Sequence, residues 1–364
     1  MTEVLTGVRE SAPLAPLTTL RVGGTARWLA SARTVEDLDR AHRWCRFNGI
    51  PLLVLGGGSN VVIADEGFNG LVVHIDIRGR ERFEDGEDTL FRVGAGENWD
   101  VTVAQCVERG LAGVECLSGI PGTVGATPIQ NVGAYGQEVA EVIDHVTAYD
   151  RQDGVTRTFS SPECGFSYRM SRFKKADSSR FVICDVTFRL RAGNPTVTYP
   201  DIVDSLRQTG VSSPDVGDVR NAVLAVRRRK GMVLDPSDPD TRSVGSFFMN
   251  PIVSAADRDR VAVAVGTQPS AFPADSGLVK LSAAWLIERA GFRRGETDGN
   301  VGISTKHTLA LVNHGGATAR DVLRLAARIK QGVLDRFGIN LRPEPVFIGF
   351  SDNPTVDFLN AETM

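Results

Sequence analysis

Two glycine-rich segments are the first candidates for chemistry. The first glycine loop is LGGGSNVV, residues 55–62. Consecutive glycines lack the Cβ atoms that would keep a phosphate away from the backbone, and their N–H groups can point at it. No Gly-Lys-Ser/Thr follows, so the loop is not of the Walker type, and the β-branched run after it does not open the helix that a GxGxxG nicotinamide-binding turn requires. A tight turn between two strands stays an open alternative.

The second glycine loop is GIPGTVGATPIQNVGAYG, residues 119–136, and it carries no charged residue. A plain surface loop of this length is usually more charged, although that interpretation stays open. Two uncharged glycine loops together suit a long ligand with a pyrophosphate and a flat ring, held by backbone groups. The chemistry that these loops favour is therefore the binding of a dinucleotide-like cofactor.

The elements around the two loops alternate between strands and helices. A capping box of Thr34 and Asp37 predicts the start of a helix with Val35, Leu38, Ala41 and Cys45 on one face. Strands are predicted at residues 51–55, 61–63, 71–77 and 90–96, and strand-like alternation returns at 142–149 and 181–190. Asn98 is expected to cap a helix whose apolar face carries Val101, Ala104, Val107 and Leu111.

The second half of the chain contains two further helix signals. Residues 195–200 and 212–218 look like connectors, and the next helix carries Val219, Val223 and Val226 before the basic run RRRKG. Thr318 and Asp321 should cap a long final helix with Val322, Leu325, Ile329, Val333 and Phe337 on one face, and Gly338 should end it. The pattern predicts an α/β or α+β protein of several domains.

Composition limits the class of protein. The chain has 364 residues, 42% of them hydrophobic and 23% charged, with a net charge of −3. A chain of this length is expected to form more than one domain, each with its own hydrophobic core. The net charge gives no reason to expect nucleic acid or an anionic membrane as partner. No apolar run is long enough for a membrane span, and no secretory signal is visible, so a cytoplasmic protein is expected. The five cysteines are expected to be buried reduced thiols rather than metal ligands, and no metal site is predicted.

The order of several motifs resembles one enzyme family. LGGGSN, VGAG at 93–96, GIPGTVGA and PIQNVGAYG are similar to the FAD-binding half of UDP-N-acetylenolpyruvoylglucosamine reductases. The likeness continues through FSYRMSRFK, TYPDI, RRRKG, GSFFMNP, LVKLSAAWLIE and LRPEPVFIG, and so spans nearly the whole chain. It implies an α+β protein with an FAD-binding domain of the vanillyl-alcohol oxidase and cresol methylhydroxylase type, plus a substrate-binding α+β domain. The segments PIQNVGAYG and TYPDI imply the subclass with an extra loop over the substrate.

The reaction implied by the resemblance transfers a hydride from NADPH, through noncovalent FAD, to the enolpyruvyl group of UDP-N-acetylglucosamine enolpyruvate. Three residues match the catalytic positions of the family. Ser246 would protonate the carbanion formed beside the substrate carboxylate, and Arg169 would pair with that carboxylate. Glu344 would have to be protonated or partnered, because an ionised side chain would repel the substrate. Without the resemblance, a turn serine, a surface cation and a solvated glutamate would be the default interpretations.

The resemblance also implies two sets of binding residues. The cofactor set comprises Leu55, Gly56, Gly57, Gly58, Ser59, Asn60, Gly119, Ile120, Pro121, Gly122, Val124, Gly125, Ala126, Gln130, Asn131, Gly133, Ala134 and Tyr135. The substrate set comprises Tyr199, Lys230, Asn250 and Lys280, of which Lys230 could otherwise be a solvated cation at a helix end. The chain departs from the family pattern at Met249, where lysine is common, and at Phe272, where tyrosine is common. These departures affect the details of the diphosphate or nicotinamide contacts.

Three domains are expected from these motifs: 1–77 with 335–364, 78–213, and 214–334. The first two would bind FAD and the third the substrate, and a monomer is expected. A sugar or lactone oxidase of the same fold and a non-catalytic nucleotide-sugar binding protein are the alternatives. The first would need neither NADPH nor the Ser-Arg-Glu set, and the second would be favoured if a member of that set were replaced.

Overall fold

The computed structural model describes residues 7–195 and 197–362, which form two compact units. Unit 1 comprises residues 1–12, 26–58 and 69–233, and unit 2 comprises residues 13–25, 59–68 and 234–364. The chain therefore passes into unit 2 and back more than once. The finer division into three domains stays a prediction.

A four-stranded sheet in the order β1-β2-β5-β3 lies at the start of the chain. Its strands are β1 (Arg9–Pro13), β2 (Thr25–Ala32), β3 (Leu52–Leu55) and β5 (Phe68–Ile75), and β3 runs parallel to β5. Helix α1 (Val35–Asn48) begins with the predicted capping box of Thr34 and Asp37, and Leu38, Ala41 and Cys45 are buried. Strand β2 lies within a stretch from which no strand was predicted.

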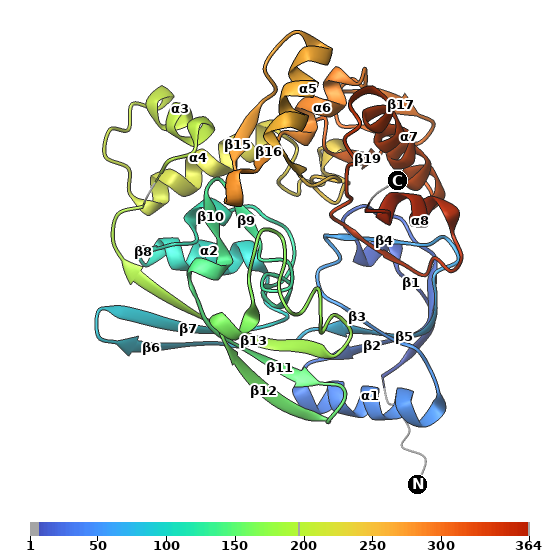
Figure 1. Cartoon of the computed structure of the whole chain (residues 1–364). Helices are drawn as coiled ribbons and strands as arrows, with labels where there is room; N and C mark the ends of the chain where they lie inside the picture. Colours follow the sequence, from blue (N-terminus) through green and yellow to red (C-terminus); the bar gives the residue numbers. More distant parts are fainter. Residues whose placement is uncertain (1–6, 196, 363–364) are drawn as a thin grey trace. The chain divides into compact units, whose positions relative to one another are not determined.

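The second sheet of unit 1 is antiparallel, with the order β12-β11-β13-β7-β6 and the short strand β8 paired to β13 (Figure 1). The strands are β6 (Arg80–Asp85), β7 (Asp88–Gly94), β8 (Leu111–Ala112), β11 (Ile143–Asp150), β12 (Val155–Ser160) and β13 (Phe181–Ala192). Strands β11 and β13 confirm the predicted segments 142–149 and 181–190. Every residue of β6 is exposed, so an apolar pattern could not reveal it.

Helix α2 (Trp99–Glu108) is capped by Asn98 as predicted, but its predicted apolar face is only partly correct. Val101 is 46% exposed, whereas Trp99, Val103 and Cys106 are almost fully buried. Thr102 is buried on the same side, because its hydroxyl donates a hydrogen bond to the main-chain oxygen of Asn98 at 2.9 Å. The buried face therefore includes a polar residue that pattern reasoning assigns to solvent.

Helices α3 (Pro200–Gln208) and α4 (Val216–Arg229) pack against each other in unit 1. Val219, Val223 and Val226 line the buried side of α4, as predicted. Helix α3 was not predicted, because its first turn lies in the TYPDI segment, which the family resemblance associated with a loop over the substrate. Pro200 suits the start of α3 because the first helical position needs no backbone N–H donor.

Unit 2 contains short strands and the longest helix. The pair β4 (Val61–Ile63) and β20 (Val346–Ile348) is parallel. Two three-stranded sheets have the orders β14-β16-β15 and β17-β18-β19. Their strands are β14 (Ile252–Val253), β15 (Ala271–Pro273), β16 (Val279–Leu281), β17 (Thr297–Asp298), β18 (Val301–Ile303) and β19 (Leu311–Asn313). The helices are α5 (Ala255–Val265), α6 (Ala283–Arg289), α7 (Ala319–Phe337) and α8 (Pro354–Asn360).

Helix α7 has the predicted cap, buried face and end. Thr318 and Asp321 form its capping box, and Gly338 ends it with a φ of +64°. The five predicted apolar positions from Val322 to Phe337 are all buried. The agreement follows from a helix that carries both its cap and its apolar stripe within one continuous segment.

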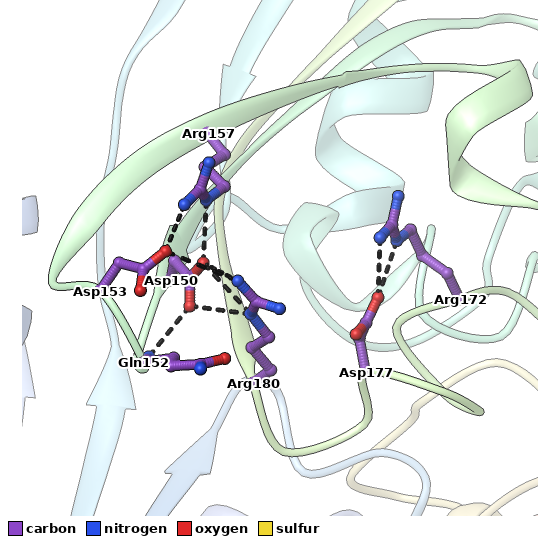
Figure 2. A network of polar contacts seen from close by, with 7 residues as sticks. All are labelled: Asp150, Gln152, Asp153, Arg157, Arg172, Asp177 and Arg180. Atoms are coloured by element: carbon purple, nitrogen blue, oxygen red, sulfur yellow. Dashed lines mark hydrogen bonds and ion pairs between the residues drawn. The ribbon is translucent and has the colours of Figure 1, made fainter.

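A network of ion pairs stabilises the end of β11 (Figure 2). The Asp150 carboxylate accepts hydrogen bonds from Arg180 at 2.7 Å and Arg157 at 2.8 Å. These bonds, led by that from Arg180, hold the pKa of Asp150 well below its usual range. Arg172 and Asp177 form a separate pair in the same view, at 2.9 Å.

The five cysteines are free and buried, as predicted. Burial raises the pKa of the Cys45 thiol to about 11 and that of each of the other four to about 12, so none is a ready nucleophile. Among residues 7–195 and 197–362 no cluster of metal-binding side chains occurs. No helix in the same ranges has the length and apolar character to cross a membrane.

Candidate active site

The two glycine loops approach each other backbone to backbone within unit 1. A Cβ added to Gly57 would lie 2.7 Å from the Cα of Gly122 and 3.2 Å from the Thr123 nitrogen. A Cβ added to Gly56 would lie 2.8 Å from the Thr123 hydroxyl. Side chains on the first loop would therefore force the loops apart, which explains why glycines occupy these positions.

The second glycine loop lies along residues 94–99, the segment that follows β7. The Gly125 N–H donates to Ala95 O at 2.9 Å, and the Val124 N–H donates to Glu97 O at 2.9 Å. A Cβ on Gly125 would lie only 2.5 Å from the Ala95 Cβ. Loops of bare, uncharged backbone such as these are typical of sites that bind the pyrophosphate of a cofactor such as FAD.

Charged side chains that the sequence analysis missed hold the beginning of the second loop. Asp100 accepts a 2.6 Å hydrogen bond from the Gly119 N–H, and a bidentate pair with Arg220 at 2.7 and 3.0 Å. Burial would raise the pKa of Asp100, but the hydrogen bonds from Arg220 and Gly119 outweigh it and lower that pKa. The Arg227 guanidinium donates to Gly119 O at 3.3 Å and to Met232 O at 2.7 Å.

Gly119 is thereby fixed through both its N–H and its carbonyl, in a conformation with a φ of +73°. Burial lowers the pKa of Arg227, whose Nε is buried without a hydrogen-bond partner. The sequence shows an acidic residue in the first turn of α2 and a basic run at the end of α4. Neither feature indicates that both side chains bond to the Gly119 backbone.

Arg169 lies at a tight turn of unit 1. Ser167 and Met170 exchange two backbone hydrogen bonds of 3.0 Å, which close the turn around Tyr168 and Arg169. The φ of Arg169 is +55°, a conformation that side chains seldom adopt. Its guanidinium donates to Gly133 O of the second glycine loop at 2.7 Å. The structure thus brings the predicted carboxylate-binding residue to the predicted cofactor loop.

The end of the second loop forms a small hairpin, β9 (Gly133–Ala134) with β10 (Gln137–Glu138). Tyr135 lies at its turn with a φ of +51°. Its ring contacts the Tyr199 ring edge to face, with 5.3 Å between centroids. Burial raises the pKa of both phenols.

Lys230 joins this aromatic pair. Its ammonium lies 5.8 Å from the centre of the Tyr135 ring and forms a 2.7 Å ion pair with Asp201 in the first turn of α3. Three residues predicted for ligand binding, Tyr135, Tyr199 and Lys230, therefore lie together in unit 1. Tyr199 is the residue before α3, so residues 195 and 197–199 form a connector as predicted and only Pro200 of this segment belongs to the helix.

Unit 2 brings together Ser246, Glu344 and Asn60. Ser246 forms a β-bridge with Ala310, and the next residue, Phe247, accepts the Glu344 N–H at 2.8 Å. The Asn60 side chain donates to the main-chain oxygen of Glu344 at 3.3 Å. Two predicted catalytic residues and one end of the first glycine loop are thus fixed by neighbouring backbone segments.

The segment that carries Ser246 is rigid because Phe247 and Phe248 after it are almost fully buried. The Met249 N–H donates to Arg342 O at 2.9 Å, so this segment lies between residues 309–310 and 342–344. A serine followed by two core phenylalanines is held more firmly than a turn serine would be.

The predicted substrate residues Asn250 and Lys280 also belong to unit 2. The Asn250 side chain accepts the Ala283 N–H at 2.9 Å at the start of α6. Lys280 lies in β16 between Ile252 of β14 and Phe272 of β15. Phe272, one of the two departures from the family pattern, is therefore a direct cross-strand neighbour of Lys280.

Comparison with known proteins places this geometry in a family. A model described as "FAD binding domain" matches residues 26–160, and one described as "UDP-N-acetylenolpyruvoylglucosamine reductase, C-terminal domain" matches residues 235–348. A UDP-N-acetylenolpyruvoylglucosamine reductase of Thermobifida fusca is 52% identical over 94% of this chain and 99% of its own length. The chain belongs to the UDP-N-acetylenolpyruvoylglucosamine reductase family. It is therefore an FAD-containing oxidoreductase of α+β architecture.

Two further relatives agree with this assignment. The UDP-N-acetylenolpyruvoylglucosamine reductase of Streptomyces coelicolor is 51% identical over 93% of this chain and 89% of its own length. The crystal structure of UDP-N-acetylenolpyruvylglucosamine reductase from Thermus caldophilus has a TM-score of 0.63 and 26% identity, and covers 94% of this chain and 98% of its own. The resemblance inferred from the motifs is confirmed, as is the FAD-binding fold.

Proposed function

We propose that this enzyme uses NADPH to reduce the enolpyruvyl group of UDP-N-acetylglucosamine enolpyruvate, giving UDP-N-acetylmuramate for peptidoglycan synthesis in the cytoplasm. The observation that carries the proposal is near-full-length identity of about one half to reductases of that name. Bound FAD would supply the hydride transfer between the two substrates. The residues of this chain position the substrate, stabilise charge and move a proton.

Ser246 is the proposed proton donor. The carbon beside the substrate carboxylate becomes a strong base after it loses its double bond, so a hydroxyl is acidic enough to protonate it. The bridge to Ala310 and the buried phenylalanines after Ser246 fix the position of the serine backbone. A fixed donor delivers the proton to one face of the carbon.

Arg169 and Glu344 are proposed to hold the substrate carboxylate as negative charge moves onto it. A guanidinium can form two parallel hydrogen bonds with a carboxylate, which suits Arg169. Glu344 would donate a hydrogen bond to the same group. Its backbone is held by Phe247 O and fixed by the flanking Pro343 and Pro345.

Tyr199, Lys230, Asn250 and Lys280 are proposed to bind the UDP-sugar. The Lys230 ammonium already pairs with Asp201, so a diphosphate would have to share or replace that partner. Lys280 would contribute a second cation. Leu55–Asn60 and the predicted residues of the 119–135 segment other than Asn131 are proposed to hold FAD.

The absorption spectrum of the purified protein tests the proposal. Oxidised flavin bands should be present, should bleach on anaerobic addition of NADPH, and should return when UDP-N-acetylglucosamine enolpyruvate is added. Bleaching by a sugar or lactone and recovery only with oxygen would instead identify an oxidase. A protein that binds the UDP-sugar without any spectral cycle would be a non-catalytic binding protein.

A further inference from the structure

The side chain of Asn131 is buried in unit 1, and hydrogen bonds within the protein occupy it. Asn131 is 1% exposed. Its Nδ2 donates to the Glu138 carboxylate at 2.6 Å and to Ser167 O at 3.1 Å, and its Oδ1 accepts the Ala140 N–H at 3.1 Å. An amide nitrogen has two hydrogens, and both are used here. The side chain therefore has no donor left for a ligand.

Ser167, whose main-chain oxygen accepts a hydrogen bond from the Asn131 amide, is the first residue of the turn that contains Arg169. Ser167 and Met170 close the turn, and Arg169 lies within it at a φ of +55°. The neighbouring Ser171 hydroxyl donates to Ile129 O at 2.6 Å, and the Arg169 guanidinium donates to Gly133 O at 2.7 Å. Residues on both sides of Asn131 thus contact the same turn.

Such a turn needs support, because a left-handed conformation of a residue with a side chain is strained and persists only when the surroundings determine it. Asn131 supplies this support by donating a hydrogen bond to the Ser167 carbonyl. Glu138 in turn orients the amide, since a hydrogen bond to a carboxylate is stronger than one between neutral groups.

We propose that Asn131, oriented by Glu138, is a positioning residue that places the Arg169 guanidinium for the reaction. The inference rests on the proposed function, in which Arg169 binds the substrate carboxylate. It assigns Asn131 a role through Arg169 instead of the direct cofactor contact that the family resemblance implied. A small displacement of a guanidinium weakens its bidentate geometry, and a misplacement of about 1 Å can cost about a hundredfold in rate.

The variant Asn131→Asp isolates this role. Aspartate has the same shape and also tolerates a positive φ, so the backbone conformation is kept. It retains the oxygen that accepts the Ala140 N–H, loses both donors, and places a second carboxylate beside Glu138. In stopped-flow traces we expect normal flavin reduction by NADPH and reoxidation by the enolpyruvyl substrate slowed by about 10- to 100-fold.

A double-mutant cycle with Arg169→Ala separates positioning from general damage. If Asn131 acts through Arg169, Asn131→Asp should slow reoxidation no further in the Arg169→Ala background. Glu138→Gln keeps an oxygen acceptor for the Asn131 amide but loses the charge that strengthens the hydrogen bond, so it should slow reoxidation less than Asn131→Asp does. Gln137→Ala is the matched control: that amide bonds to Glu115 and Cys116 rather than to the turn, and its loss should leave reoxidation unchanged.

Four results would overturn the proposal. Equal slowing of both half-reactions by Asn131→Asp, or an additive effect with Arg169→Ala, would make Asn131 a structural residue only. Normal reoxidation in Asn131→Asp while Arg169→Ala is slow would refute the positioning role and leave the proposed function intact. Normal reoxidation in Arg169→Ala would refute the role of Arg169, and the positioning role with it.

Discussion

At the scale of single residues, the close approach of the two glycine loops restricts which residue can occupy position 57. Gly57 has an ordinary φ, so its requirement is steric and arises from the approach of Gly122. A Cβ at 2.7 Å from a backbone carbon cannot be relieved by rotation of a side chain. The close approach of the two backbones thus depends on one missing methyl group.

Gly57→Ala should therefore weaken FAD binding. The variant is expected to purify with little or no yellow colour, and titration of the apoprotein with FAD should show a dissociation constant raised by about tenfold or more, since each 1.4 kcal/mol of displaced backbone contact is a factor of ten. Gly193→Ala, at a glycine with no positive φ and with nothing within 4 Å of the added Cβ, is the control for loss of flavin during purification. Full flavin occupancy in Gly57→Ala would mean that the first loop is only a turn.

Ser246→Ala should separate the two halves of the reaction. Flavin reduction by NADPH should be nearly normal, because the serine is proposed to act only on the enolpyruvyl substrate. Reoxidation should slow by about 10²–10⁴-fold, the usual effect of a positioned proton donor. Single-turnover traces for each half measure the difference, and equal slowing of both would show a general disturbance of the segment before Phe247.

At the scale of elements, helices α3 and α4 carry the proposed substrate contacts of unit 1. Tyr199 packs beside Tyr135 and against a buried cluster that includes Ile202, Leu206 and Val223. The ring is thus part of the core between the helices, while Lys230 and Asp201 connect their ends. A role in binding therefore depends on the Tyr199 hydroxyl more than on the ring.

Two substitutions of Tyr199 distinguish these parts. Tyr199→Phe keeps the ring contact, so its melting temperature should be unchanged, while the KM for the enolpyruvyl substrate rises by about tenfold or more for the loss of a hydrogen bond to a charged group. Tyr199→Ala should also lower the melting temperature, because it removes buried aromatic area. An unchanged KM in Tyr199→Phe would leave the residue with a packing role alone.

At the scale of the whole molecule, the C-terminal segment of unit 2 is attached to α7 by a buried cation. The Lys330 ammonium donates to Leu359 O at 2.8 Å and to Ala361 O at 3.2 Å, and the residue is 1% exposed. Burial, followed by the charge of Arg342, lowers the pKa of Lys330 to about 8. The folded protein therefore releases this proton at a lower pH than the unfolded chain, in which a lysine titrates near 10.4.

The stability of the protein should consequently depend on Lys330 in mildly alkaline solution. Between pH 8 and about 10.4 the unfolded state binds more protons, so the contribution of Lys330 to the free energy of unfolding rises with pH, and below pH 8 the full penalty of the buried charge remains. In urea unfolding, the free energy of unfolding of wild type relative to that of Lys330→Met should rise by roughly 1–3 kcal/mol across this pH interval. Lys175→Met, at an exposed lysine, is the control, and a constant difference between wild type and Lys330→Met would contradict the expectation.

Local sequence alone determined the features whose causes lie within one short segment. Helices α1 and α7 carry their capping boxes and apolar stripes in consecutive residues, so the start of both and the end of α7 could be predicted. The buried cysteines and the core strands β11 and β13 followed from apolar patterning in the same way. The family could be recognised because its motifs occur in order along the chain.

Tertiary structure decided the features that depend on partners distant in sequence. The buried face of α2 was decided by its packing, in which the Trp99 ring contacts that of Phe188 in β13. The side chain of Asn131 is committed to Glu138 and Ser167, and Asp100 and Arg227 converge on Gly119 from helices over a hundred residues apart. Hydrogen-bond partners and burial arise only when the folded chain brings such segments together, so no local pattern could assign these roles.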